Sequence, residues 1–177
     1  VYLNGKKVGE HLGGYVTFNM DITKFIKFDE VNLLAVKLSN AHNEDLPPLG
    51  GDLCHFGGIY RDVYLVATEK VHFDLEFYGS EGIFITYPGI TEKEATLNIW
   101  GRIANKGDKS GNYKIIHEVF DPEGDKVEEI ASEIKLDAGK TGKFESEGKK
   151  ISNPVLWSPE NPELYLLKSK ILTENNQ

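Results

Sequence analysis

The chain has little cysteine, no clustering of positive charge and no long apolar run, and each shortage excludes a class of protein. Cys54 is the single cysteine among 177 residues, so neither an intramolecular disulfide nor a cysteine-based zinc site can form. The formal net charge is −8 and no basic stripe is visible, which argues against nucleic acid as a partner. No apolar run approaches the roughly 20 residues of a membrane span.

A helix-length repeat of about 3.6 residues is also missing, and short strands separated by turns take its place. Hydrophobic residues make up 40% of the chain, enough for a packed core. Asn4-Gly5 lies between two short strand-like runs, which is the pattern of a tight hairpin with a type I′ turn. Strands every 8–12 residues or so, with turns between them, predict an all-β protein built from antiparallel sandwiches.

The first 69 residues are expected to form one β domain. Asp21 or Thr23 would cap a single helical turn through Phe25-Ile26. Residues 31–38 are almost wholly apolar and predict a buried strand, and residues 59–67 predict another with Ile59, Arg61, Val63, Leu65 and Ala67 on one face. Residues 39–58 between them form a loop longer than about 15 residues, and loops of that length are often functional.

A domain boundary is expected around Thr68-Glu69-Lys70, which leaves residues 70–177 for a second domain. Its strands are expected where apolar residues alternate between turns, over residues 71–77, 83–85, 95–103, 113–120, 126–136, 142–151 and 164–172. Asp121-Pro122-Glu123-Gly124 predicts a β-turn with proline at its second position.

Two stretches resemble glycoside hydrolase family 2, the β-galactosidase-like enzymes. The segments VYLNGKKVGEHLGGYVTFNMDITKFI, VNLLAVKLSN and GGIYRDVYLVA are similar, in order and spacing, to the second half of that family's sugar-binding jelly-roll domain. The segment NPVLWSPENPELY, residues 153–165, resembles the late part of the immunoglobulin-like domain that follows it. The resemblance covers nearly the whole chain.

The resemblance implies a partial jelly-roll β-sandwich followed by an immunoglobulin-like β-sandwich that lacks its last strand. The chain would be the non-catalytic portion of a retaining β-glycosidase. In the parent protein, the first half of the jelly roll would precede this sequence, and a last sandwich strand and the catalytic (β/α)8 barrel that the chain supports would follow it. Hydrolysis needs two carboxylates that flank the scissile bond, and in the family both are barrel glutamates. A non-enzymatic carbohydrate-binding or adhesion protein built of β-sandwiches is the alternative.

Asp52 is the residue to which the resemblance assigns a substrate contact, with His55 as a second candidate. In the family, an aspartate at this spacing before the Gly-Ile-x-Arg strand reaches into the active site and accepts hydrogen bonds from sugar hydroxyls. An ionised carboxylate only accepts, so two adjacent hydroxyls can both donate to it. The alternative is a loop aspartate in an Asx-turn. Asn43-Glu44 is superficially similar to the family's acid/base pair, but its polar loop setting predicts a surface residue.

Other residues favour structural roles. We expect Arg61 to pair with a buried acid, Cys54 to be a packed residue, and Trp157 to plug the end of a sandwich in preference to stacking on a sugar. His42, Asp45, Asp52 and His55 are irregularly spaced, which is weak evidence for a cation site.

The resemblance implies no cofactor here, although sodium or magnesium binds in some intact members, and it implies carbohydrate as the parent's substrate. A bacterial periplasmic or secreted location is favoured over the cytoplasm, and an oligomer is left open.

Overall fold

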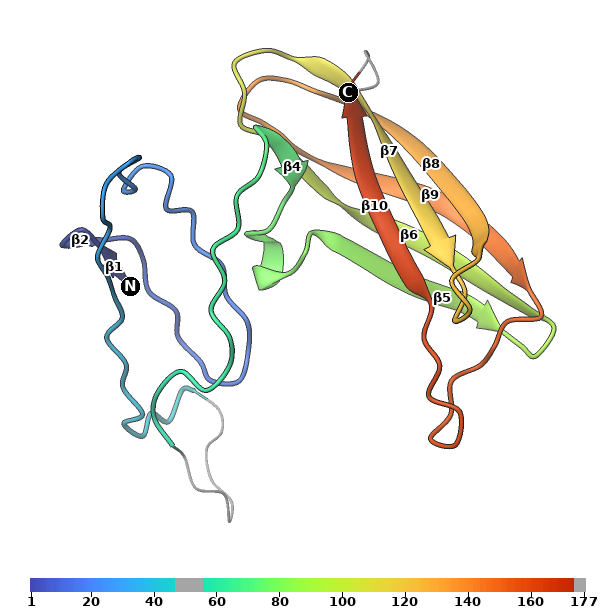
Figure 1. Ribbon diagram of the computed structural model, residues 1–177, viewed down its shortest axis with the longest axis horizontal. Coiled ribbons are helices and arrows are strands. Elements are labelled where there is room, and N and C mark those ends of the chain that lie inside the picture. The colour runs from blue at the N-terminus through green and yellow to red at the C-terminus, as the bar shows by residue number, and fades with distance from the viewer. Residues whose placement is uncertain (47–55, 174–177) are drawn as a thin grey trace. The chain divides into compact units, whose positions relative to one another are not determined.

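The computed structural model describes residues 1–46 and 56–173, and these residues contain strands and one short 3-10 helix (Figure 1). The all-β prediction is therefore confirmed. Two compact units can be separated: unit 1 comprises Val1–Ala67 together with Tyr78–Ser80, and unit 2 comprises Thr68–Phe77 together with Glu81–Gln177. In the described part of the chain, no helix is long and apolar enough to cross a membrane.

Unit 1 contains a small antiparallel sheet in the order β2-β1-β3, formed by Tyr2–Leu3 (β1), Lys6–Lys7 (β2) and Leu34–Ala35 (β3). The predicted hairpin is confirmed, because Tyr2 pairs with Lys7 and both turn residues have positive φ, 53° at Asn4 and 78° at Gly5. The predicted helical turn is also present, and Asp21 caps it by accepting a 2.8 Å hydrogen bond from the Thr23 amide.

Unit 1 buries little of its apolar surface, and two strand predictions are wrong for that reason. Leu3 is the buried hydrophobic residue among those described in this unit. Residues 31–38 form a strand only at β3, and Val31 is 94% exposed. Residues 59–67 form no strand, and their apolar side chains are exposed. A strand is stable when another strand or layer covers its apolar face, and the described residues of unit 1 provide no such cover.

Unit 2 is an antiparallel sandwich of two sheets, as predicted (Figure 1). One sheet has the order β10-β7-β8, formed by Leu166–Thr173 (β10), Gly111–Phe120 (β7) and Lys126–Leu136 (β8). In the other, β6 (Glu94–Asn105) is central and pairs with β4 (Val71–Phe73), β5 (Ile83–Ile90) and β9 (Thr141–Ser152). The predicted turn between β7 and β8 is present, closed by a 3.0 Å bond from the Gly124 amide to the Asp121 carbonyl.

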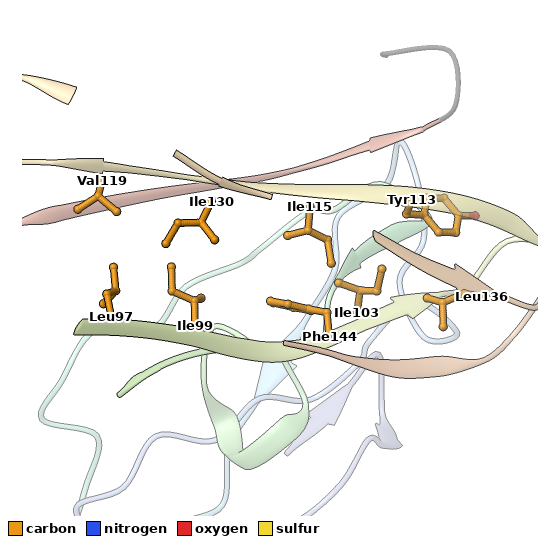
Figure 2. Packing of buried hydrophobic residues seen from close by; sticks show 9 residues of the cluster. All are labelled: Leu97, Ile99, Ile103, Tyr113, Ile115, Val119, Ile130, Leu136 and Phe144. Carbon is orange, nitrogen blue, oxygen red and sulfur yellow. The ribbon is translucent and has the colours of Figure 1, made fainter. Parts of the chain in front are cut away.

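The core of unit 2 lies between these sheets, and strict alternation builds it. Every odd-numbered residue of β6 from Ala95 to Ile103 is buried, while the even-numbered residues to Arg102 are half-buried on the opposite face. Figure 2 shows the side chains that meet in this core: Leu97, Ile99, Ile103, Tyr113, Ile115, Val119, Ile130, Leu136 and Phe144. A core of this size supports a stable sandwich.

The alternation predicted over residues 71–77 stops at Phe73, and the rest of that strand prediction is wrong. Asp74 turns toward the outer face of the sheet, where its carboxylate pairs with Arg102 at 3.2 Å. The chain then enters the 3-10 helix η1 (Phe77–Gly79), and the Phe77 ring meets Phe84 and Trp100 edge-on. Phe77 therefore packs on the outer face of the sheet, away from the core between the sheets.

Candidate substrate-binding loop

The loop over residues 39–58 begins with a local turn that explains why Glu44 is a surface residue. The Asp45 amide donates to the Asn43 side-chain oxygen at 2.9 Å, and the Leu46 amide donates to the Asn43 carbonyl at 3.2 Å. This is an Asx-turn, the structure that asparagine favours in loops. Glu44 is exposed in the middle of it, so the surface-loop prediction for Glu44 is confirmed.

The two ends of the loop approach each other at its base. A β-carbon placed on Gly57 would lie 3.1 Å from the side-chain carbon of Asn40, so the backbone at Gly57 and the Asn40 amide are in close contact. Gly58 has a φ of +116°, a conformation that residues with a side chain rarely adopt. The two ends of the loop therefore meet at Asn40 and Gly57, and the chain turns at Gly58 in a conformation that favours glycine.

Asp52, His55 and Cys54 lie outside the described residues, which omit 47–55. The expected sugar contacts of Asp52 and His55 stay predictions.

Aromatic side chains gather beside the end of the loop. The rings of Tyr15 and Tyr60 are 5.9 Å apart, and the Arg61 guanidinium lies 5.5 Å from the centre of the Tyr60 ring. Arg61 is exposed, and the contact of its cation among the described residues is with the adjacent Tyr60 ring. The expected ion pair with a buried acid stays a prediction. Tyr15 and Tyr60 are 45 residues apart in sequence, and their contact could not be read from spacing.

The described ionisable groups with clear pKa shifts have structural explanations. Hydrogen bonds from Lys7 and Lys126 lower the pKa of the exposed Glu10 and Glu129 carboxyl groups, the opposite of what a general acid in a glycosidase requires. Burial lowers the pKa of His117 to about 4, so its imidazole is neutral at pH 7. In residues 1–46 and 56–173, no three His, Cys, Asp or Glu side chains gather into a metal site.

Trp157 does not plug the end of the sandwich. Its side chain is 58% exposed, on the connection between β9 and β10. The residue of this segment that packs on the core is Tyr165, whose hydroxyl accepts a 3.0 Å hydrogen bond from the Val155 amide. The tyrosine therefore anchors the segment and the tryptophan faces outward.

Comparison with known proteins identifies the family. The model of glycosyl hydrolases family 2 matches residues 81–177, more than half of the chain. A β-galactosidase of Thermoanaerobacter pseudethanolicus is 34% identical over 99% of this chain and 22% of its own length, and β-galactosidase BoGH2A of Bacteroides ovatus is 33% identical over 97% and 19%. The crystal structure of a Bacteroides uniformis β-glucuronidase superposes with a TM-score of 0.90 at 40% identity, covering 98% of this chain and 21% of that one. The chain spans about a fifth of the length of these relatives. With its family match, its sandwich architecture and its motifs in agreement, the chain belongs to the glycosyl hydrolases of family 2.

Proposed function

We propose that this chain is the non-catalytic β-sandwich portion of a retaining β-glycosidase. Its role is to support the catalytic (β/α)8 barrel of the parent protein and to lend the loop over residues 42–58 to the sugar pocket. Family membership combined with coverage of about a fifth of the relatives is the observation that carries this proposal. The relatives include β-galactosidases and β-glucuronidases, so the substrate class is a β-linked terminal sugar.

Asp52 is the residue proposed to bind the sugar, with His55 beside it. The contact between Asn40 and Gly57 supports this role, because it brings the two ends of the segment that carries Asp52 close together in the described part of the chain. A carboxylate that accepts from two hydroxyls favours the distorted ring of the transition state if those bonds tighten there. Losing such charge-assisted hydrogen bonds weakens binding of the transition state by roughly 1.5–3 kcal/mol.

The experiment is kinetics and melting of the intact parent enzyme carrying Asp52→Asn. We expect kcat/KM to fall by about one to two orders of magnitude with little change in melting temperature, because the substitution keeps the shape and removes the charge. Asp45→Asn is the matched control, since Asp45 is an exposed carboxylate of the same loop whose backbone amide makes the Asx-turn bond.

Chromogenic β-galactoside and β-glucuronide are both tested. An unchanged kcat/KM for Asp52→Asn would reduce Asp52 to a turn residue. Turnover by the purified 177-residue chain, abolished by substitutions within it, would contradict the non-catalytic role. A parent sequence without a barrel would replace the proposal with the carbohydrate-binding alternative.

A further inference from the structure

Three polar atoms in the core of unit 2 have no hydrogen-bond partner among the described residues. They are His117 Nε2 and the hydroxyl oxygens of Ser132 and Ser146, and all three atoms are buried. The whole of His117 is buried, and Ser146 is 2% exposed. A polar atom that leaves water for a core without gaining a hydrogen bond destabilises the fold, so most such atoms in native proteins have a partner. Three of them in one core indicate a bound molecule that supplies hydrogen bonds.

The pairing of the strands places all three side chains on the inner faces of the two sheets. Ser132 of β8 is directly opposite the core residue Ile115 of β7, and His117 follows Ile115 by two residues on the same face. Ser146 of β9 is directly opposite the core residue Ile99 of β6. Two of the polar groups therefore face inward from one sheet and the third faces inward from the other sheet.

The three groups share one neighbourhood around the ring of Phe144, which lies between the sheets (Figure 2). The His117 ring stacks on Phe144 with their centroids 5.5 Å apart. Ser146 is two residues from Phe144 on the same face of β9, a rise of roughly 7 Å. Ser132 is the diagonal cross-strand neighbour of His117, at roughly 7–8 Å between Cα atoms. A small molecule in this neighbourhood can reach polar groups of both sheets.

The chemistry of His117 selects a neutral molecule that can both donate and accept. Its Nδ1 lies 2.7 Å from the Ser169 hydroxyl, and burial lowers the pKa of the imidazole to about 4, so the ring is neutral at pH 7. In a neutral imidazole one nitrogen donates and the other accepts, and a serine hydroxyl can satisfy either. A neutral ring and two hydroxyl groups carry no charge that attracts an ion. Water is the molecule that meets these requirements.

We propose that the core of unit 2 binds internal water, which bridges His117 Nε2 to the hydroxyl groups of Ser132 and Ser146. Buried water in proteins typically makes about three hydrogen bonds to polar atoms that have no other partner. The bridge joins the two sheets, because β7 and β8 belong to one and β9 to the other. Hydrogen bonds are directional, so the bridge favours one alignment of the sheets, which apolar burial alone does not specify. This water site is independent of the proposed sugar-binding role.

The test combines a high-resolution crystal structure of the intact parent with nuclear Overhauser effects from water to the His117 ring in the isotope-labelled 177-residue chain. We expect ordered water about 2.7–3.2 Å from His117 Nε2, bonded to at least one of the two serine hydroxyls, and an effect at the ring proton beside Nε2. Ser132→Ala combined with Ser146→Ala should abolish that effect, because buried water needs at least about two polar partners. Ser152→Ala is the matched control and should leave the effect unchanged, since Ser152 is an exposed serine of β9.

Four results would overturn the inference. A dry core in the crystal, or no transfer from water to the His117 ring, would show that no water is bound. A direct hydrogen bond from a serine hydroxyl to Nε2 would show that the side chains satisfy one another. Water bonded to Nε2 and to neither serine would refute the bridge between the sheets, and an effect that persists in the double alanine variant would place the water elsewhere. If the double variant does not fold, the wild-type measurements still decide, because they need no substitution.

Discussion

Gly101→Ala should destabilise unit 2 severely, although it adds one methyl group. Gly101 lies in the central strand β6, where it pairs with Ile83 of β5 and Phe144 of β9. A β-carbon here would fall far inside contact distance of the Gly82 carbonyl oxygen and 2.7 Å from the Phe144 ring. The carbonyl is backbone and cannot turn aside, and it accepts a 3.0 Å hydrogen bond from the Arg102 amide. Relief of the clash therefore requires a shift of the strand pairing itself.

The magnitude follows from three terms. Overpacking of a core costs about 1–3 kcal/mol. Loss of the bond between Arg102 and Gly82 adds about 1 kcal/mol. In the opposite direction, alanine lowers the conformational entropy of the unfolded chain, which stabilises the folded state by about 0.4–1 kcal/mol. We expect the free energy of unfolding of unit 2 to fall by about 1–3.5 kcal/mol, with a central value of about 2 kcal/mol, which lowers Tm by roughly 10 °C for a domain of this size.

The assay is thermal and urea unfolding of the whole chain followed by far-UV circular dichroism, which reports mainly on unit 2 because the long strands lie there. Gly89→Ala is the matched control: Gly89 is a strand residue of β5 with nothing within 4 Å of the added carbon. The control should unfold within about 0.5 kcal/mol of the wild type. If Gly101→Ala were as stable as Gly89→Ala, the close approach of Gly82 and Gly101 would be refuted.

Two further predictions concern buried polar groups of unit 2. His117 is fully buried, its pKa is about 4 when folded and near 6.5 when unfolded, and its Nδ1 lies 2.7 Å from the Ser169 hydroxyl. As pH falls from about 6.5 to 4 the unfolded chain binds a proton that the folded chain refuses, so stability should fall by up to about 3 kcal/mol, and urea titrations should show this pH slope weakened in His117→Leu. Asn105→Ala should lower the free energy of unfolding by about 2–4 kcal/mol in the same titration, because the buried amide donates to the Lys109 and Asp137 carbonyls and accepts from the Gly107 amide. A loss below 0.5 kcal/mol or so would mean that water replaces the Asn105 side chain.

Local chemistry by itself determines much of unit 2. The alternation of Ala95, Leu97, Ile99 and Ile103 specifies both the strand β6 and its buried face. The limits of β8 coincide with the run from Lys126 to Leu136, because the Asp121–Gly124 turn precedes it and the sheet partner β7 is close in sequence. The same holds for the Asn4-Gly5 hairpin, whose turn depends on two adjacent residues that tolerate positive φ.

Tertiary structure decided the features that depend on a distant partner. Residues 31–38 and 59–67 are rich in residue types that favour strands. A strand also needs a partner strand for its hydrogen bonds and a layer that covers its apolar face, and residue types alone do not determine either. Phe77 continues the alternation of its strand in sequence, yet β4 ends at Phe73, and the Phe77 ring packs against Phe84 and Trp100 on the outer face of the sheet. The sequence predicted that Trp157 fills the end of the sandwich. Only the fold brings the Tyr165 hydroxyl to the Val155 amide, and with the tyrosine packed on the core, the tryptophan lies exposed at the surface.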